Sequence, residues 1–318
     1  RDSYITDAGI NLADFNGITD QVTVDGSLYE LPFRSDYWLI YYNKDVFDAA
    51  GIAYPSNDMT MEDYDALARQ LTDTTYGSQV YGCHYHTWRS AVELFGILDG
   101  KHSILDGNYD WMIPYYDMIL SEEDDGVCQT YTDLSTEGLH YSAAFSNGNV
   151  AMMNMGSWFI STLISNLDSG EYDSSLCGNW GIASYPHPDG AEAGSTIATI
   201  TGLAVTSASA NKDAAFDFVN WVSGTEGAKV MASTGNFPAI MTDDVINTIA
   251  GMAGFPTDEG SKEALNITNA YLEVPYAENV SEINSILDTY HTSIMNREVT
   301  VEEGVASMNE QVGKILNQ

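Results

Sequence analysis

Trp38-Leu39-Ile40-Tyr41-Tyr42-Asn43-Lys44-Asp45-Val46-Phe47-Asp48-Ala49-Ala50-Gly51 is the stretch that decides the fold class. Its first five residues form an unbroken apolar run, which is typical of a buried strand. Asn43 is a favoured helix-capping residue, and a short helix is expected to follow it and to end at Gly51. A buried strand that leads directly into a helix indicates an α/β fold.

The alternation of strands and helices continues on both sides of this stretch. Thr60 and Asp63 resemble a capping box that opens a helix, and Thr300 and Glu303 form another near the end of the chain. Residues 85–145 are expected to be mostly helical. Further strands are expected at 151–155, 180–185 and 203–206. This order predicts α/β lobes with mainly parallel sheets.

One more helix is expected after Asn211, which is placed to cap it. Its apolar residues recur on one face, and Trp221 lies near that stripe. The spacing predicts that Trp221 packs in the core and does not contact a ligand.

Length and charge limit the classes of function. A chain of 318 residues is long for one domain, so two lobes are expected. The net charge of −35 excludes nucleic acid and anionic lipid as main partners. No stretch reaches the ~18 uncharged apolar residues of a membrane-spanning helix. The first residues show no signal-peptide pattern, so we expect a signal peptide and a lipid anchor to be absent from this chain.

Motifs of catalysis and of metal binding are scarce. No nucleophile elbow, Walker loop or dinucleotide-binding glycine motif is present. His84 and His86 could share one face of a strand and bind a metal, but no third ligand is near in sequence. The three cysteines contain no C-x-x-C pair, and the sequence leaves their pairing open. We therefore expect no catalytic residue, no cofactor and no metal.

Aromatic residues are abundant for so acidic a chain, with twenty Tyr and six Trp. Tyr and Trp combine a flat apolar face with a polar group, which suits the ring of a sugar. The composition thus favours carbohydrate as a ligand, although most of these side chains are expected to fill the core.

Four groups of motifs, in family order, resemble the extracellular solute-binding proteins of carbohydrate ABC importers, of the maltose-binding-protein-like family 1. The matches extend over nearly the whole chain and comprise Tyr29–Phe33 with Leu39–Gly51, Ala144–Met152 with Gly156–Trp158, Trp180–Pro186 with Gly202–Val205 and Asn211–Ala215, and Thr234–Ala239, followed by a tail at Val299–Val305. Each motif alone is modest, and their order makes the resemblance specific.

The resemblance implies a two-lobed periplasmic-binding-protein-like fold of type II. The N-lobe would combine residues 1–33 with 200–258, and the C-lobe would combine 34–198 with 259–318. The hinge crossings would lie near 31–35, 197–201 and 254–260. The family's opening strands, which precede the Leu31-Pro32-Phe33 segment, are absent here, so we expect the N-lobe to be incomplete.

The resemblance also implies the function. A monomer would capture a mono- or oligosaccharide between the lobes, without catalysis, and deliver it to the membrane permease subunits of an ABC importer. It would act at the extracellular face of the membrane through a lipid anchor, or in the periplasm. The identity, length and linkage of the sugar stay open.

Ligand-binding residues follow from the family positions. Trp158 corresponds to a sugar-stacking Trp, and Trp88, with Tyr85 beside it, corresponds to an aromatic platform. Asp36 corresponds to a carboxylate just after the hinge. The further candidates are Arg34 and Tyr37 near the same hinge, and Tyr276 and Glu278 near another cleft segment. Strand alternation allows either Tyr37 or Trp38, but not both, to face the ligand.

Two other functions stay open. A glycoside hydrolase would need two carboxylates facing each other, and 46 acidic residues offer too many pairs for the sequence to select one. The same binding fold could instead hold a polyamine, thiamine or an iron chelate. A polyamine site would use acidic and aromatic side chains together, and this chain has both.

Overall fold

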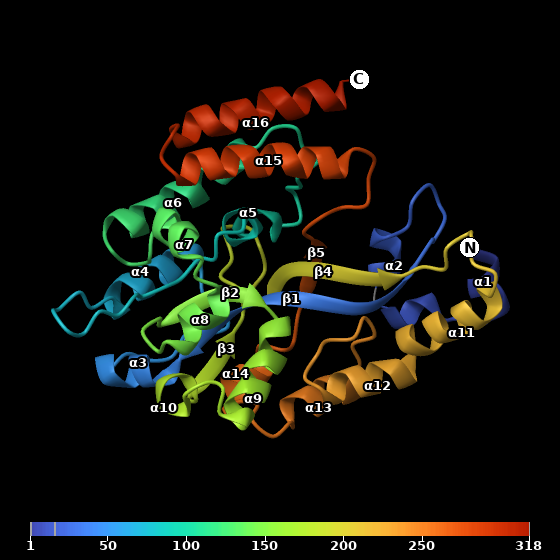
Figure 1. Cartoon of the computed structure of the whole chain (residues 1–318), viewed down its shortest axis with the longest axis horizontal. Coiled ribbons are helices and arrows are strands. Elements are labelled where there is room, and N and C mark those ends of the chain that lie inside the picture. Colours follow the sequence, from blue (N-terminus) through green and yellow to red (C-terminus); the bar gives the residue numbers. More distant parts are fainter. Residues whose placement is uncertain (1, 16, 318) are drawn as a thin grey trace.

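The computed structural model describes residues 2–15 and 17–317. The predicted N-lobe segment 1–33 includes Arg1 and Asn16, which lie outside the described residues. A five-stranded sheet in the order β2-β1-β4-β5, with β3 also paired to β1, runs through the molecule (Figure 1). The strands are β1 (Leu31–Asn43), β2 (Met152–Gly156), β3 (Trp180–Ala183), β4 (Ser195–Leu203) and β5 (Asn269–Leu272).

Strand β1 connects two parts of this sheet. Its first half, from Leu31 to Tyr37, pairs with β4, and its second half, from Trp38 to Asn43, pairs with β2 and β3. The register with β4 shifts between Pro32 and Arg34, where the ladder has an irregularity. Proline has no N–H to donate to a ladder, which accounts for an interruption at this place.

The prediction of mainly parallel sheets is wrong. β1 pairs antiparallel with β2, β3 and β4, and only the pairing of β4 with β5 is parallel among the named strands of the described chain. The apolar run from Trp38 to Tyr42 is fully buried, as predicted. Burial on both faces produces such a run in either strand direction, so the pattern could not distinguish the two. The strand expected at 203–206 is also displaced, since β4 ends at Leu203.

Most of the other predicted elements are present. The side chain of Asn43 accepts a hydrogen bond from the Asp45 amide and caps the next helix. The capping boxes at Thr60 and Thr300 are both formed. The helices, including two short 3-10 turns, are α1 (Asp2–Asp7), η1 (Leu12–Phe15), α2 (Ile18–Gln21), α3 (Lys44–Ala50), α4 (Met61–Leu71), α5 (Ser90–Ile97), η2 (Asp110–Met112), α6 (Ile113–Asp124), α7 (Tyr131–Glu137), α8 (Tyr141–Ser146), α9 (Trp158–Ser169), α10 (Ser174–Cys177), α11 (Lys212–Ser223), α12 (Thr225–Ser233), α13 (Asp243–Ala250), α14 (Glu259–Glu263), α15 (Val280–Met295) and α16 (Val301–Leu316). None of the helices described is both long and apolar enough to cross a bilayer.

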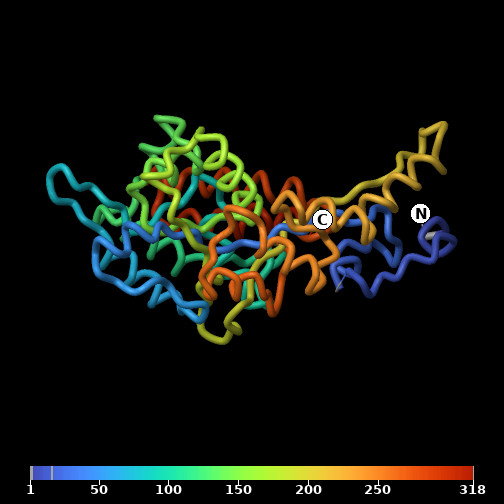
Figure 2. Tube along the Cα trace, turned by 90° about the horizontal axis from the view of Figure 1, so that it is seen from below, coloured from blue at the N-terminus to red at the C-terminus, as the bar shows by residue number. Residues whose placement is uncertain are grey.

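The hydrophobic core is unevenly distributed. One large cluster surrounds the second half of β1 and reaches α16. Two small clusters lie at the end of the molecule that carries α1 and α11 (Figures 1 and 2) and combine residues 5–31 with 219–240. The large cluster also includes Val245, Ile249 and Phe255, which the sequence division assigns to the N-lobe.

The prediction that Trp221 packs in the core is wrong. Its side chain on α11 is 52% exposed, and Val219 is the buried residue of this helix face. Only a small core cluster lies beneath α11, so the apolar stripe covers less surface than its spacing indicates.

Candidate functional site

Two tryptophans form the centre of an aromatic group near the middle of the sheet. Trp158 is the first residue of α9, is separated from the end of β2 by Ser157, and is half-buried. Its ring stands edge-on to the buried Trp38, with ring centroids 5.6 Å apart, and lies 6.2 Å from the ring of Trp88. Trp88 precedes α5 and is 40% exposed. The structure thus brings together the two residues that the sequence identified as ring-stacking candidates.

Further rings hold these tryptophans in place. The indole N–H of Trp158 donates a hydrogen bond to the Tyr141 hydroxyl, 3.1 Å away. The rings of His86 and Tyr141 lie 4.7 and 5.7 Å from that of Trp88. Burial, and then the proximity of His140, lowers the pKa of His86 to about 4, so this ring is neutral at pH 7. An uncharged aromatic surface suits the C–H faces of a sugar ring.

Gly156 makes room for the Trp158 indole. A Cβ at this position would lie 2.2 Å from the six-membered part of the ring, much closer than van der Waals contact. The missing side chain at the end of β2 therefore determines how closely the ring approaches the sheet.

Replacing Gly156 with alanine is expected to displace the Trp158 ring and to destabilise the fold by about 1–3 kcal/mol through overpacking. Near-ultraviolet circular dichroism would report the moved indole, and thermal unfolding would report the loss of stability. Gly313→Ala is the matched control, because a Cβ there meets nothing within 4 Å. An unchanged aromatic signal in Gly156→Ala would contradict this account.

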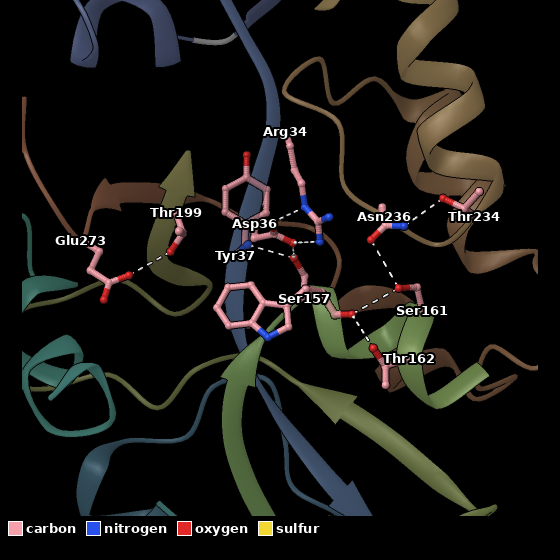
Figure 3. A network of polar contacts seen from close by, with 12 residues as sticks. Arg34, Asp36, Tyr37, Ser157, Ser161, Thr162, Thr199, Thr234, Asn236 and Glu273 are labelled. Atoms are coloured by element: carbon pink, nitrogen blue, oxygen red, sulfur yellow. Dashed lines mark hydrogen bonds and ion pairs between the residues drawn. The ribbon is translucent and has the colours of Figure 1, made fainter. Parts of the chain in front are cut away.

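Polar side chains lie beside the aromatic group along β1. Asp36 is 4% exposed and accepts hydrogen bonds from the Ser157 hydroxyl at 2.8 Å and from Arg34 Nε at 2.5 Å. The Ser157 hydroxyl also accepts from the backbone N–H of Tyr37. Ser157 directly precedes Trp158, so this network couples the stacking residue to β1 (Figure 3). Asp36 is thus a buried residue of β1 with two side-chain partners.

Two further polar contacts lie on either side of Asp36 (Figure 3). Thr199 lies opposite Asp36 in the ladder with β4 and donates to Glu273 at 2.9 Å. On the other side, Ser161 of α9 donates to the side-chain oxygen of Asn236 at 3.3 Å. Hydroxyl, amide and carboxylate groups are those that recognise sugar hydroxyls.

Two hollows bear on the location of the site. One of about 410 Å³ lies beside Trp88 and also contacts Glu273, Asn284 and Asp288. A larger one of about 740 Å³ lies between α1, α11 and residues 28–31. The larger hollow is not the better candidate, because neither Trp88 nor Trp158 lines it. It also lies beside a small core cluster and not beside the main one.

Three predicted residues lie apart from the aromatic group. Tyr85 is 6% exposed, and its hydroxyl donates to the buried Glu122 at 2.6 Å, so its side chain is directed away from Trp88. Tyr276 follows β5 and donates to Glu30 at 2.5 Å. Glu278 is exposed on the same loop.

Tyr37 and Trp38 are both buried. The Tyr37 ring packs edge-on against that of Phe237, with ring centroids 6.0 Å apart. The buried Trp38 ring packs edge-on against that of Trp158. Both rings belong to the main hydrophobic cluster, and the backbone N–H of Tyr37 donates to the Ser157 hydroxyl.

The two histidines of the pair lie in different surroundings. His84 is fully buried and forms a backbone bridge with Met153, whereas His86 faces the Trp88 ring. Within residues 2–15 and 17–317, neither belongs to a group of three potential metal ligands.

Sequence reasoning missed Tyr141, Glu273 and Asn236. Tyr141 begins a helix just before the Ala144–Met152 motif, but no local pattern marks it as a partner of Trp158. Glu273 and Asn236 reach the site from loops distant in sequence. Because the chain has 46 acidic residues, nothing in the sequence distinguishes Glu273 from the others.

Comparisons with known proteins agree on one family. The sequence model of the bacterial extracellular solute-binding proteins matches residues 2–229. A crystal structure described as a sugar transporter from Rhizobium etli, in an open conformation, is 47% identical, covers 98% of this chain and 78% of its own, and superimposes with a TM-score of 0.90.

Two more distant relatives carry ligand names. A substrate-binding protein from Listeria monocytogenes, in complex with cycloalternan, is 22% identical, with 99% of this chain and 79% of its own covered and a TM-score of 0.81. A mannitol-binding protein from Pseudomonas aeruginosa is 24% identical over 68% of this chain. That match spans about half the length of the mannitol-binding protein, 49%.

Proposed function

Because this chain belongs to the family of bacterial extracellular solute-binding proteins, we propose that it captures a sugar or oligosaccharide outside the cytoplasm. It does so without altering the sugar, as the substrate-binding component of an ABC importer. Membrane permease subunits would receive the ligand. A lipid anchor or a periplasmic location would keep the protein at the outer side of the cell membrane.

The observation that best supports this proposal is the arrangement of Trp158 and Trp88. Their rings lie 6.2 Å apart, and Trp88 is accessible to solvent. A sugar would place its C–H face on these rings and its hydroxyls toward Asn236, Glu273 and the Arg34–Asp36 pair. The two carboxylates have different partners, since Asp36 binds Arg34 and Ser157, and Glu273 binds Ser90 and Thr199.

Capture of the ligand would use a hinge between two lobes. One lobe would combine residues 1–33 with 200–258, and the other would combine residues 34–198 with 259–318. Small core clusters that combine residues 5–31 with 219–240 support the first of these groups. The packing of Val245 and Phe255 in the main core favours a boundary closer to residue 240. Strands β1 and β4 would be the hinge, because both run between the two groups.

A thermal-shift series tests the proposal. The probes are D-mannitol, cycloalternan, maltose and common monosaccharides, with spermidine as the polyamine control. A sugar at a hundred times its Kd adds about 2.7 kcal/mol to the free energy of unfolding. The melting temperature is then expected to rise by roughly 5 °C.

Two results would contradict this function. Stabilisation by spermidine with no response to any saccharide would indicate the same fold serving a polyamine. New saccharide products after prolonged incubation, detected by chromatography, would indicate an enzyme.

A further inference from the structure

Two cysteines and a glutamate form a buried group away from the aromatic site. The sulfur atoms of Cys83 and Cys128 and a carboxylate oxygen of Glu122 all lie within 4.8 Å of one another. Cys83 follows α4 and Cys128 follows α6, and the backbone N–H of Cys83 donates to the Val127 carbonyl at 3.4 Å. Two distant segments are therefore held side by side where their thiols meet.

The hydrogen bonds within this group come from uncharged donors. Glu122 is fully buried, and its hydrogen bonds come from the uncharged Tyr85 hydroxyl and the Cys83 thiol. Burial raises the pKa of Glu122 to about 12 and raises the pKa of Cys83, so both are protonated at neutral pH.

A structural metal suits this group poorly. A zinc site needs thiolates and, as a rule, four ligands in a closed tetrahedron. In the part of the chain that the structure describes, the group supplies three. A disulfide needs neither charge nor a fourth ligand, and it would leave Tyr85 donating to Glu122.

We propose that Cys83 and Cys128 form a disulfide bond when the chain folds under oxidising conditions. Two S–H bonds break and one Sγ–Sγ bond forms. The two electrons and two protons pass to a disulfide oxidant such as glutathione disulfide, which becomes two thiols. Both cysteines are buried in the folded chain, so the bond forms during folding.

The third cysteine stays reduced. Cys177 ends α10, and its thiol contacts the Asp173 carbonyl and lies outside the group of Cys83 and Cys128. It is equally buried, which makes it an internal control for reactivity.

The bond would also bear on the aromatic site. Cys83 lies five residues before Trp88, on the segment that carries His86 and Trp88. A bond to Cys128 would restrain the position of the segment that carries Trp88. This effect does not depend on whether a saccharide is the ligand.

The test refolds the full chain in a glutathione redox buffer and then alkylates the free thiols. We expect a mass lower by two hydrogen atoms and one alkylated residue, Cys177. A protease that cleaves after glutamate separates the three cysteines, because Glu93, Glu123, Glu137 and Glu171 lie between them. The digest without reductant should contain a linked Cys83–Cys128 peptide.

Stability and two variants complete the design. The oxidised protein should melt on the order of 5–10 °C above the reduced protein. Cys177→Ser should keep this difference and the linked peptide, and Cys128→Ser should lose both.

Three outcomes would overturn the proposal. They are three alkylated thiols after oxidative refolding, a linked peptide that contains Cys177, and stoichiometric zinc that protects Cys83 and Cys128 from alkylation. The wild-type mass measurement decides even if Cys128→Ser does not fold. Saccharide binding is read separately, so failure here leaves the proposed function standing.

Discussion

Replacing Trp158 with alanine is expected to weaken saccharide binding by roughly 30-fold or more, which corresponds to about 2 kcal/mol. The indole supplies one of the two neighbouring ring faces, and its N–H fixes Tyr141 at the edge of the group. Truncation removes the stacking surface and also leaves the Tyr141 hydroxyl without this donor. Isothermal titration with the saccharide that gives the largest thermal shift measures the loss.

Trp221→Ala is the matched control for this experiment. It removes the same side chain from α11, where the indole is exposed and outside the aromatic group, and it should leave the Kd unchanged. Equal Kd values for wild type and Trp158→Ala, with both proteins folded by circular dichroism, would refute stacking at this position.

Replacing Arg89 with methionine is expected to lower the free energy of unfolding by about 3–5 kcal/mol. Arg89 and Glu93 are both almost fully buried, and Arg89 Nε lies 2.6 Å from the Glu93 carboxylate. The guanidinium also donates to the Asn284 carbonyl and side chain and pairs with Asp288, so it ties α5 to α15. Without it, burial leaves the Glu93 carboxylate uncompensated. Urea unfolding measures the change.

The control for Arg89 is another arginine with two acidic partners. Arg69 pairs with Asp65 and Asp125 but is one-third exposed, so Arg69→Met should cost at most about 1 kcal/mol. The double variant Arg89→Met with Glu93→Leu should recover much of the stability, because no buried charge remains. If the Arg89 and Arg69 variants lose the same stability, the buried pair does not have the role described here.

The local elements of this fold could be predicted because their causes are local. The side chain of Asn43 caps its helix as expected, and the capping boxes at Thr60 and Thr300 form from residues three positions apart. Strand direction could not be predicted, because the apolar run of β1 contains no information about its partners. The exposure of Trp221 depends on how much core lies beneath α11, which its own periodicity does not specify.

Part of the candidate site could also be predicted from the sequence. Trp158 and Trp88 could be identified because they occupy family positions, and the structure brings their rings together. Tyr85 lies one residue before His86 and three before Trp88 in the sequence, but its hydroxyl is directed toward Glu122. Neighbours in an irregular segment need not share a direction, and only the tertiary partner of each side chain determines where it points.

Strand β1 has a mechanical consequence. One continuous backbone belongs to two pieces of the sheet, and the ladder is interrupted between Pro32 and Arg34, next to the Arg34–Asp36 pair. The section from Ile40 to Tyr42 has hydrogen-bonded strands on both edges, β2 and β3. The interruption affects only the β4 edge, because on the other edge the backbone of Ser35 and Phe33 bonds that of Phe237 and Ala239. We therefore expect twisting between the two ends of β1 to be taken up on the β4 edge at this interruption, beside the Arg34–Asp36 pair.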